Sequence, residues 1–401
     1  MLYMNTVLTN YLVLWATNLL LTISAFGLID LGTEKLQTYL QISTPIIYEI
    51  NRQINFPHHI NLGLEATSSH PITDVIFYYT FNGQDTVIYG KPPFTPNKSV
   101  EVSHKINSNK ADYLPPGLLI TWHCKITDSQ GNTIETEKET FIYLDPSRRW
   151  QKIESENLNL YWYNTNKNII RKIISETNIL LTTSKNIFDF NNQTSINAVI
   201  INNDRNSMPP ISSKATSTHL YQGFAFAEYN TVLISKPNSE LLAHELVHIY
   251  LDQKVGIYKP FVPAWLNEGL ANYFTASPPG AVKLNHKSQN WFKLKNMHKV
   301  PGKPLDVHKF YNQSEKVVAY LIGSYDEEKM KMLLEELSSG KKITEAMLKS
   351  YGFSLEQLDS LWPTNSIYER KQPINTIYVI GTVLFILVFI FSVIIFNKNY
   401  H

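Results

Sequence analysis

The spacing of apolar residues divides the chain into a strand-rich part and a helix-rich part. Over residues 46–144 apolar side chains recur at every second position, which is the period of a β-strand. Residues 118–127 and 133–144 flank a turn sequence and predict a hairpin. The first part is therefore expected to be an antiparallel β-sandwich, immunoglobulin-like in outline, over residues 45–145.

From residue 150 the apolar period changes to that of helices mixed with strands. Strands are expected at 158–163, 196–201 and 231–235, and a helix at 167–188. The buried side of that helix is expected to hold Ile169, Ile170, Ile173, Ile174, Ile179 and Leu180. Later helices are expected at 313–325, 327–338, 343–350 and 355–362, with a core of Leu333, Leu334, Leu337, Met347, Leu348, Leu355 and Leu358. The fold class is α+β, with a second domain at 150–365.

One predicted helix carries the sequence His-Glu-Leu-Val-His. It begins after a capping signal at Asn238 or Ser239. Positions i and i+4 share a helix face, so His244 and His248 can present two imidazole nitrogens to one metal ion. Glu245 lies beside them, where a carboxylate can take a proton from a water activated by the metal.

A third ligand follows on the next predicted helix. Pro260 and Pro263 interrupt the chain after the first helix, and residues 264–274 then predict a second helix that carries Glu268. Two histidines and a glutamate are a known ligand set for a catalytic zinc, which keeps one coordination position open. We therefore expect one Zn²⁺ ion on His244, His248 and Glu268.

These two segments, HELVH and WLNEGLANYF, resemble the gluzincin metallopeptidases, and more closely the bacterial peptidase MA-like domain proteins. The resemblance covers residues 158–362 and implies a zincin-like α+β metallopeptidase fold. The β domain also looks like the one that precedes the catalytic part in that bacterial family. Many gluzincins place an aspartate four residues after the ligand glutamate, where this chain has Asn272. An amide accepts from an imidazole N–H but lacks the charge of a carboxylate, so the residue that orients the first histidine is left open.

The resemblance also implies a donor to the oxyanion and a strand that borders the cleft. His308, Tyr311 and Tyr320 are the candidates for the donor, and none is preferred. Residues 223–227 or 231–235 are candidates for pairing with an extended peptide. No Gly-x-Met-x-Asn segment precedes HELVH, which favours an endopeptidase over an aminopeptidase.

Composition excludes some classes of function. The 401 residues carry a net charge of +2 with Lys and Arg spread along the chain, so a nucleic-acid surface is not expected. The single Cys124 excludes an intrachain disulfide and is expected to be a buried thiol. Neither observation fixes an oligomeric state.

Two apolar segments predict attachment to a membrane. The 20 residues from Ile377 to Phe396 carry no charge, and at about 1.5 Å per residue they are long enough to cross a hydrocarbon core. A transmembrane helix is expected at 375–396. Residues 1–35, with no charged side chain before Asp30, are expected to be a signal peptide or a retained anchor.

The orientation in the membrane follows from the N-terminal segment. Lys35, Arg370 and Lys371 lie on the domain side, so the count of positive charges does not favour export. An apolar N-terminal segment normally directs a long domain outward, and that rule is given more weight. The protein is expected at the cell membrane, with one or two spans and the catalytic domain on the extracytoplasmic side.

The sequence predicts a zinc-dependent peptidase that acts on a peptide or protein substrate. A first alternative is a degenerate surface protein that binds a partner through its β domain. A second is an intramembrane metalloprotease, which the polar residues Asp252, Gln253 and Lys254 after HELVH disfavour.

Overall fold

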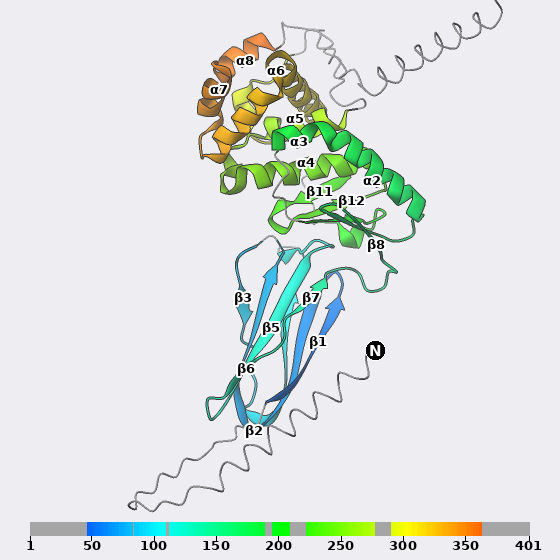
Figure 1. Ribbon diagram of the computed structural model, residues 1–401, viewed down its shortest axis with the longest axis vertical. Coiled ribbons are helices and arrows are strands. Elements are labelled where there is room, and N and C mark those ends of the chain that lie inside the picture. Colours follow the sequence, from blue (N-terminus) through cyan, green and yellow to red (C-terminus); the bar gives the residue numbers. More distant parts are fainter. Residues whose placement is uncertain are drawn as a thin grey trace, which may run out of the picture. The chain divides into compact units, whose positions relative to one another are not determined.

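The chain folds into an antiparallel seven-stranded sheet followed by a five-stranded sheet with helices (Figure 1). The computed structural model describes residues 46–82, 84–109, 112–188, 195–208, 222–276 and 290–362. These residues lie within one compact unit of the chain. The expected α+β class is confirmed, whereas the residue limits of the two domains stay a prediction.

The first sheet is organised around one long strand. Its strands are β1 (Ile47–Asn55), β2 (His59–Phe81), β3 (Ile88–Gly90), β4 (Asn97–Asn107), β5 (Leu119–Asp128), β6 (Thr133–Glu135) and β7 (Glu139–Ile142). The first half of β2 pairs with β1 and β4, and its second half pairs with β3 and β5, after a register shift between Thr67 and Ile72. Strand β5 pairs with β6 and β7, which confirms the expected hairpin.

The period-2 pattern of this sheet matches its burial. Leu62 and Leu64 on β2, and Trp122 and Cys124 on β5, are fully buried in one hydrophobic core. Apart from Gly63, their neighbours in sequence are more exposed, as expected for strands with one face toward a core. Burial raises the pKa of the Cys124 thiol to about 12, so this side chain behaves as a small apolar group.

The inner strands of the second sheet are buried on both faces. Its strands are β8 (Gln151–Ser155), β9 (Leu158–Trp162), β10 (Ile196–Ile200), β11 (Gly223–Phe226) and β12 (Thr231–Ile234), in the order β11-β12-β10-β9-β8. Strands β9, β10 and β12 are parallel, and β8 and β11 run antiparallel at the edges. Ala198 and Ile200 face the helices, and Val199 faces a separate cluster on the other side. The three expected strands are confirmed, and β8 is additional.

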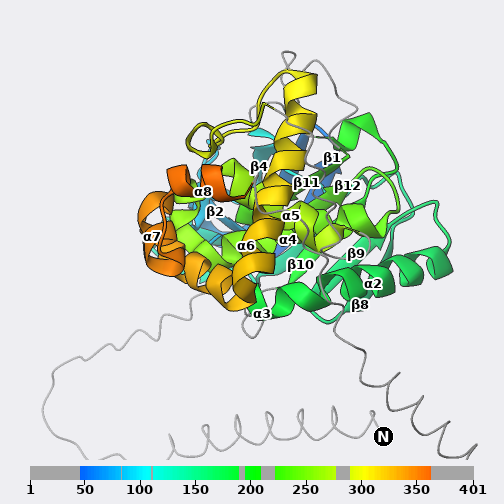
Figure 2. The same ribbon diagram turned by 90° about the horizontal axis from the view of Figure 1, so that it is seen from above.

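Seven helices are described with the second sheet. They are α2 (Lys167–Leu181), α3 (Lys185–Phe188), α4 (Ser239–Val255), α5 (Ala264–Thr275), α6 (Pro304–Ser338), α7 (Ile343–Tyr351) and α8 (Leu355–Leu361). Helix α4 packs against β11 and β12, α5 packs against α4, and α6 crosses α5 (Figure 2). The two helices expected at 313–325 and 327–338 are one element, which starts earlier, at Pro304, and bends at Asp326 (φ 73°).

The expected buried side of the first helix is wrong at two positions. Ile169 and Ile179 are 50% and 66% exposed. The buried stripe instead follows one helical face through Ile170, Ile173, Ile174, Thr177, Leu180 and Leu181. The helix also does not continue to 188, because a 3-10 turn at Thr182–Ser184 interrupts it. Leu348 on α7 is likewise exposed, at 59%, and not part of the core.

The expected membrane segments fall outside the described residues. Among the residues that the structure describes, no helix has the length and apolar character needed to cross a bilayer. Residues 1–35 and 375–396 are not among them.

The two adjacent isoleucines of α2 give a direct test of this packing. Ile170→Ala is expected to lower the free energy of unfolding by roughly 2–4 kcal/mol, because it leaves a cavity beneath the helix. Ile169→Ala is the matched control and should change it by less than about 1 kcal/mol. Urea denaturation followed by tryptophan fluorescence measures both, and equal losses would contradict the assigned face.

Candidate metal centre and catalytic cleft

Helix α4 supplies two imidazoles that point the same way. The Asn238 side chain caps this helix by accepting from the Leu241 N–H at 2.6 Å, which confirms the expected start. One turn apart, the rings of His244 and His248 lie with their centroids 4.8 Å from each other. Leu242, Leu246 and Ile249 are buried on the opposite side, so core packing fixes the direction of the histidines.

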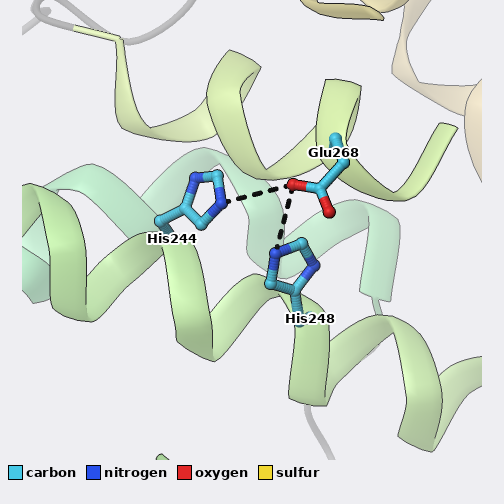
Figure 3. A group of neighbouring side chains, drawn as sticks. All are labelled: His244, His248 and Glu268. Atoms are coloured by element: carbon cyan, nitrogen blue, oxygen red, sulfur yellow. Dashed lines mark ion pairs between the residues drawn. The ribbon is translucent and has the colours of Figure 1, made fainter. Parts of the chain in front are cut away.

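Helix α5 brings a carboxylate to the same point. The chain leaves α4 at Gly256 (φ 58°), passes a 3-10 turn at Gly256–Phe261 and re-enters a helix after Pro263. Oε2 of Glu268 then lies 3.5 Å from Nε2 of His244 and 3.6 Å from Nε2 of His248 (Figure 3). One ligand atom from each residue lies within 4.8 Å of the others, which is a grouping that can hold a metal ion.

The side-chain atoms of His244, His248 and Glu268 are of the types that bind a metal ion. Oε2 of Glu268 is buried and has no hydrogen bond of ordinary geometry within the described part of the chain. A buried carboxylate oxygen without a donor is costly unless a cation lies beside it. Two neutral imidazoles and one carboxylate are the nitrogen and oxygen ligands that zinc accepts.

The charges of these groups shift one another's pKa values. Burial raises the pKa of Glu268, but the neighbouring His248, His244 and Tyr311 outweigh it, so the net pKa of this carboxyl is lowered. Burial lowers the pKa of His244, and the contacts of Glu268 and Glu245 outweigh that effect to give a net increase. The ligand carboxylate is thus kept ionised.

His248 is kept neutral and oriented by an amide. Its pKa is lowered, chiefly by burial. Its Nδ1 donates to Oδ1 of Asn267 at 2.8 Å, which assigns the proton to Nδ1 and directs the lone pair of Nε2 toward Glu268. Asn267 was not predicted, although it directly precedes Glu268. Asn272, the residue considered for this kind of role, donates its amide to the backbone oxygen of Tyr311 at 3.5 Å.

Glu245 lies beside the three ligands in a tight space against the edge strand. It is 7% exposed, and burial raises its pKa to about 7. A Cβ atom placed on Gly223 of β11 would lie 2.7 Å from Cγ and 2.8 Å from Cδ of Glu245. The carboxyl group therefore occupies space that is open only because residue 223 has no side chain. The sequence gives no signal for this role, because the contact depends on how β11 packs on α4.

A second glycine admits α6 to the site. A Cβ atom on Gly269, next to Glu268, would lie 2.5 Å from the Ser314 oxygen and 2.7 Å from Cγ2 of Val318. Because residue 269 is glycine, α6 approaches α5 closely and places His308 and Tyr311 at the cleft. Both were candidate oxyanion donors.

Tyr320 differs from the other two candidates. It is 1% exposed within the helical core and is not among the described residues that line the cleft. His308 and Tyr311 both line it, so the geometry separates the three candidates that the sequence left equal.

The cleft is a cavity of about 720 Å³ that contains the whole group. Strand β11 forms part of its wall and is the edge of the sheet, whereas β12 is covered by β11 and β10. Of the two segments considered for pairing with a peptide, only β11 borders the cavity. The other lining residues are mostly polar: Gln222, Lys236, Asn238, Glu240, Lys259, Asn267, Asn272 and Thr275.

A comparison with known protein families agrees with the class that this site indicates. Residues 212–369 match the Peptidase MA superfamily. This match confirms the resemblance that the two sequence segments indicated. No curated protein matches the sequence. Among solved structures, an aminopeptidase N family protein from Idiomarina loihiensis resembles the chain with a TM-score of 0.40 and 10% identity, over 81% of this chain and 76% of that chain.

The contact between Asn267 and His248 predicts a specific loss of metal affinity. Asn267→Ala removes the acceptor for Nδ1–H of His248, and we expect zinc to bind about 10- to 100-fold more weakly. Asn272→Ala, five positions further along the same helix, is the control and should have a much smaller effect. Titration against a chelator of known affinity measures both, and the opposite ranking would show that Asn272 is the orienting residue.

Proposed function

We propose that the chain is a zinc-dependent peptidase of the gluzincin type that acts as an endopeptidase. The observation that carries this proposal is the meeting of His244, His248 and Glu268 beside the buried Glu245 in one cavity. His244, His248 and Glu268 would hold the zinc ion, which when bound would supply Lewis-acid chemistry: polarisation of the scissile carbonyl and a lower pKa of a water molecule.

Glu245 is the proposed general base. Its pKa of about 7 lies near neutral pH, where such a carboxyl group both accepts and returns a proton efficiently. In this role it takes the proton from the attacking water and passes it to the leaving amine nitrogen. Gly223 leaves the space in which the carboxyl group moves between these two tasks.

Tyr311 is the proposed donor to the oxyanion, with His308 as the second candidate. Both side chains line the cavity from α6. The Tyr311 hydroxyl is already close enough to Glu268 to lower the pKa of that carboxyl. A neutral hydroxyl near the reacting carbonyl can donate to the negative charge that develops in the transition state.

Strand β11 is the proposed binding strand for an extended substrate. Among the described residues it is an edge strand of its sheet and borders the cavity, and this is a position at which an extended peptide can add to a sheet. Its residues Gly223–Phe226 include no carboxylate of the kind that binds a substrate amino terminus. The proposal of cleavage within a chain rests on the sequence, in which no Gly-x-Met-x-Asn segment precedes HELVH.

The membrane location also belongs to the proposal. The apolar segments at 375–396 and 1–35 support an anchored protein with its catalytic part on the extracytoplasmic side, and the first sheet is proposed to be immunoglobulin-like. Cell fractionation with added protease tests this: an intact catalytic part in cells treated from outside would place it in the cytoplasm.

Removing the general base gives a specific prediction. Glu245→Gln should keep stoichiometric zinc and lower kcat by about 100- to 10,000-fold on a mixed peptide library, because the amide cannot accept the proton. Glu345→Gln, an exposed carboxylate on α7, is the control and should leave kcat unchanged. A purified wild-type chain without zinc would instead favour a degenerate protein that binds a surface partner.

The three candidate oxyanion donors are separated by matched variants. Tyr311→Phe should lower kcat by about 10- to 1,000-fold with little change in zinc content, because only the hydroxyl is lost. Tyr320→Phe removes the same atom from a buried ring away from the cavity and should leave kcat near the wild-type value. If His308→Gln shows the loss and Tyr311→Phe does not, the donor is the histidine.

A further inference from the structure

Strand β11, the edge strand that packs on Glu245, is short. Its position therefore depends on the contacts of the turn that follows its last residue. Strand β11 has only four residues, Gly223–Phe226, and continues directly into the 3-10 turn Ala227–Tyr229 before β12. Among the described residues its strand partner is β12. A strand of this length has few ladder hydrogen bonds, so contacts at the turn contribute much of its positional order.

The turn is held from one side by the helix of the metal ligands. Asn230, in a left-handed conformation (φ 46°), ends the turn and donates its N–H to the Ala227 oxygen. Its side-chain oxygen accepts from Nε2 of Gln253 at 3.0 Å, and Gln253 lies on α4 after His248. One side of the hairpin is therefore fixed to the same helix as Glu245.

The first sheet holds the turn from the other side. The ring of Tyr229 meets Phe81 edge to face, with centroids 5.9 Å apart, and packs against the hydrophobic core of that sheet. The Asn82 amide donates to the Tyr229 backbone oxygen at 3.4 Å, and the Tyr229 hydroxyl bonds with the Gln84 side chain. Tyr229 is thus a residue of the peptidase part that is packed into the core of the N-terminal part.

Two more contacts extend this junction to β11 and to the sheet behind it. The ring of Tyr113 lies 5.8 Å from that of Phe226, the last residue of β11, and its hydroxyl donates to the Ser207 oxygen at 2.8 Å. Asn197, buried at the start of β10, donates to the Gly117 oxygen at 2.9 Å. The contacts at Phe226 and Tyr229 lie within six residues of Gly223.

We propose that the N-terminal sheet positions β11 over the general base, through the contacts of Phe81, Asn82 and Tyr113 with Phe226 and Tyr229. The N-terminal sheet then helps to position the proposed catalytic residue Glu245 and is not a spacer. Tyr229 and Asn82 are positioning residues, because they act on Glu245 only through β11. The expected change in kcat rests on the proposed peptidase function. The expected change in the order of β11 does not, and it can be measured without any activity.

The test uses the full-length chain with Tyr229→Ala, Asn82→Ala and Tyr229→Phe. Hydrogen exchange of the amides at 222–234 should become about fivefold faster or more in Tyr229→Ala and less so in Asn82→Ala. Tyr229→Phe keeps the ring and should stay near wild type. Tyr89→Ala, an exposed tyrosine on β3 of the same sheet, is the matched control and should leave these amides unchanged.

The kinetic arm follows kcat, KM and zinc content. Tyr229→Ala should lower kcat about tenfold at unchanged zinc content, because the general base is less well positioned. Gly223→Ala gives the reference for a displaced Glu245, since it moves the carboxyl group with the junction intact. Asn82→Ala is the mildest change, so it still tests the inference if Tyr229→Ala fails to fold.

Two outcomes would overturn the inference. One is unchanged exchange at 222–234 in both Tyr229→Ala and Asn82→Ala, and the other is a kcat equal to that of Tyr89→Ala despite faster exchange. An inactive wild-type chain with the expected pattern of exchange would refute the peptidase proposal alone and leave the structural role of the N-terminal sheet in place.

Discussion

The structure depends on the packing of α5 against α4, because this crossing brings three ligand atoms to one point. His244 and His248 are fixed by a helix whose other side is buried, and Glu268 arrives from a helix whose start is set by Pro263. Neither helix has a complete donor set alone. The carboxylate is buried beside two imidazoles, and burying a charged group costs free energy. The packing of the two helices must offset this cost in order to hold the arrangement that can bind a cation.

The five-stranded sheet limits where a substrate can bind. Strands β10 and β12 are covered on both faces and on both edges, so their backbone groups have no capacity left for a ligand. Strand β11 is the edge that faces the cavity, and it also confines Glu245. In the proposed mechanism, substrate binding and positioning of the base therefore depend on the same four residues.

Local sequence patterns were enough to predict most of the helices and strands and the three candidate metal ligands. The histidine pair and Glu268 follow from helical periodicity and a loop that proline interrupts, which are properties of short segments. The errors at Ile169 and Ile179 arose because a run of isoleucines fits a helix without showing which stripe is buried. Gly223, Gly269 and Tyr229 could not be found from the sequence, because their roles depend on contacts between distant segments.

The two glycines beside the site also bear on how related sequences are read. A chain can keep both histidines, the intervening glutamate and the trailing glutamate while a larger residue replaces Gly223. Such a chain retains every candidate metal ligand, but the carboxyl group of Glu245 would have to shift from the position that it has here. The pair of motifs therefore identifies the candidate ligands, and residue 223 shows whether the carboxyl group between them can keep this position.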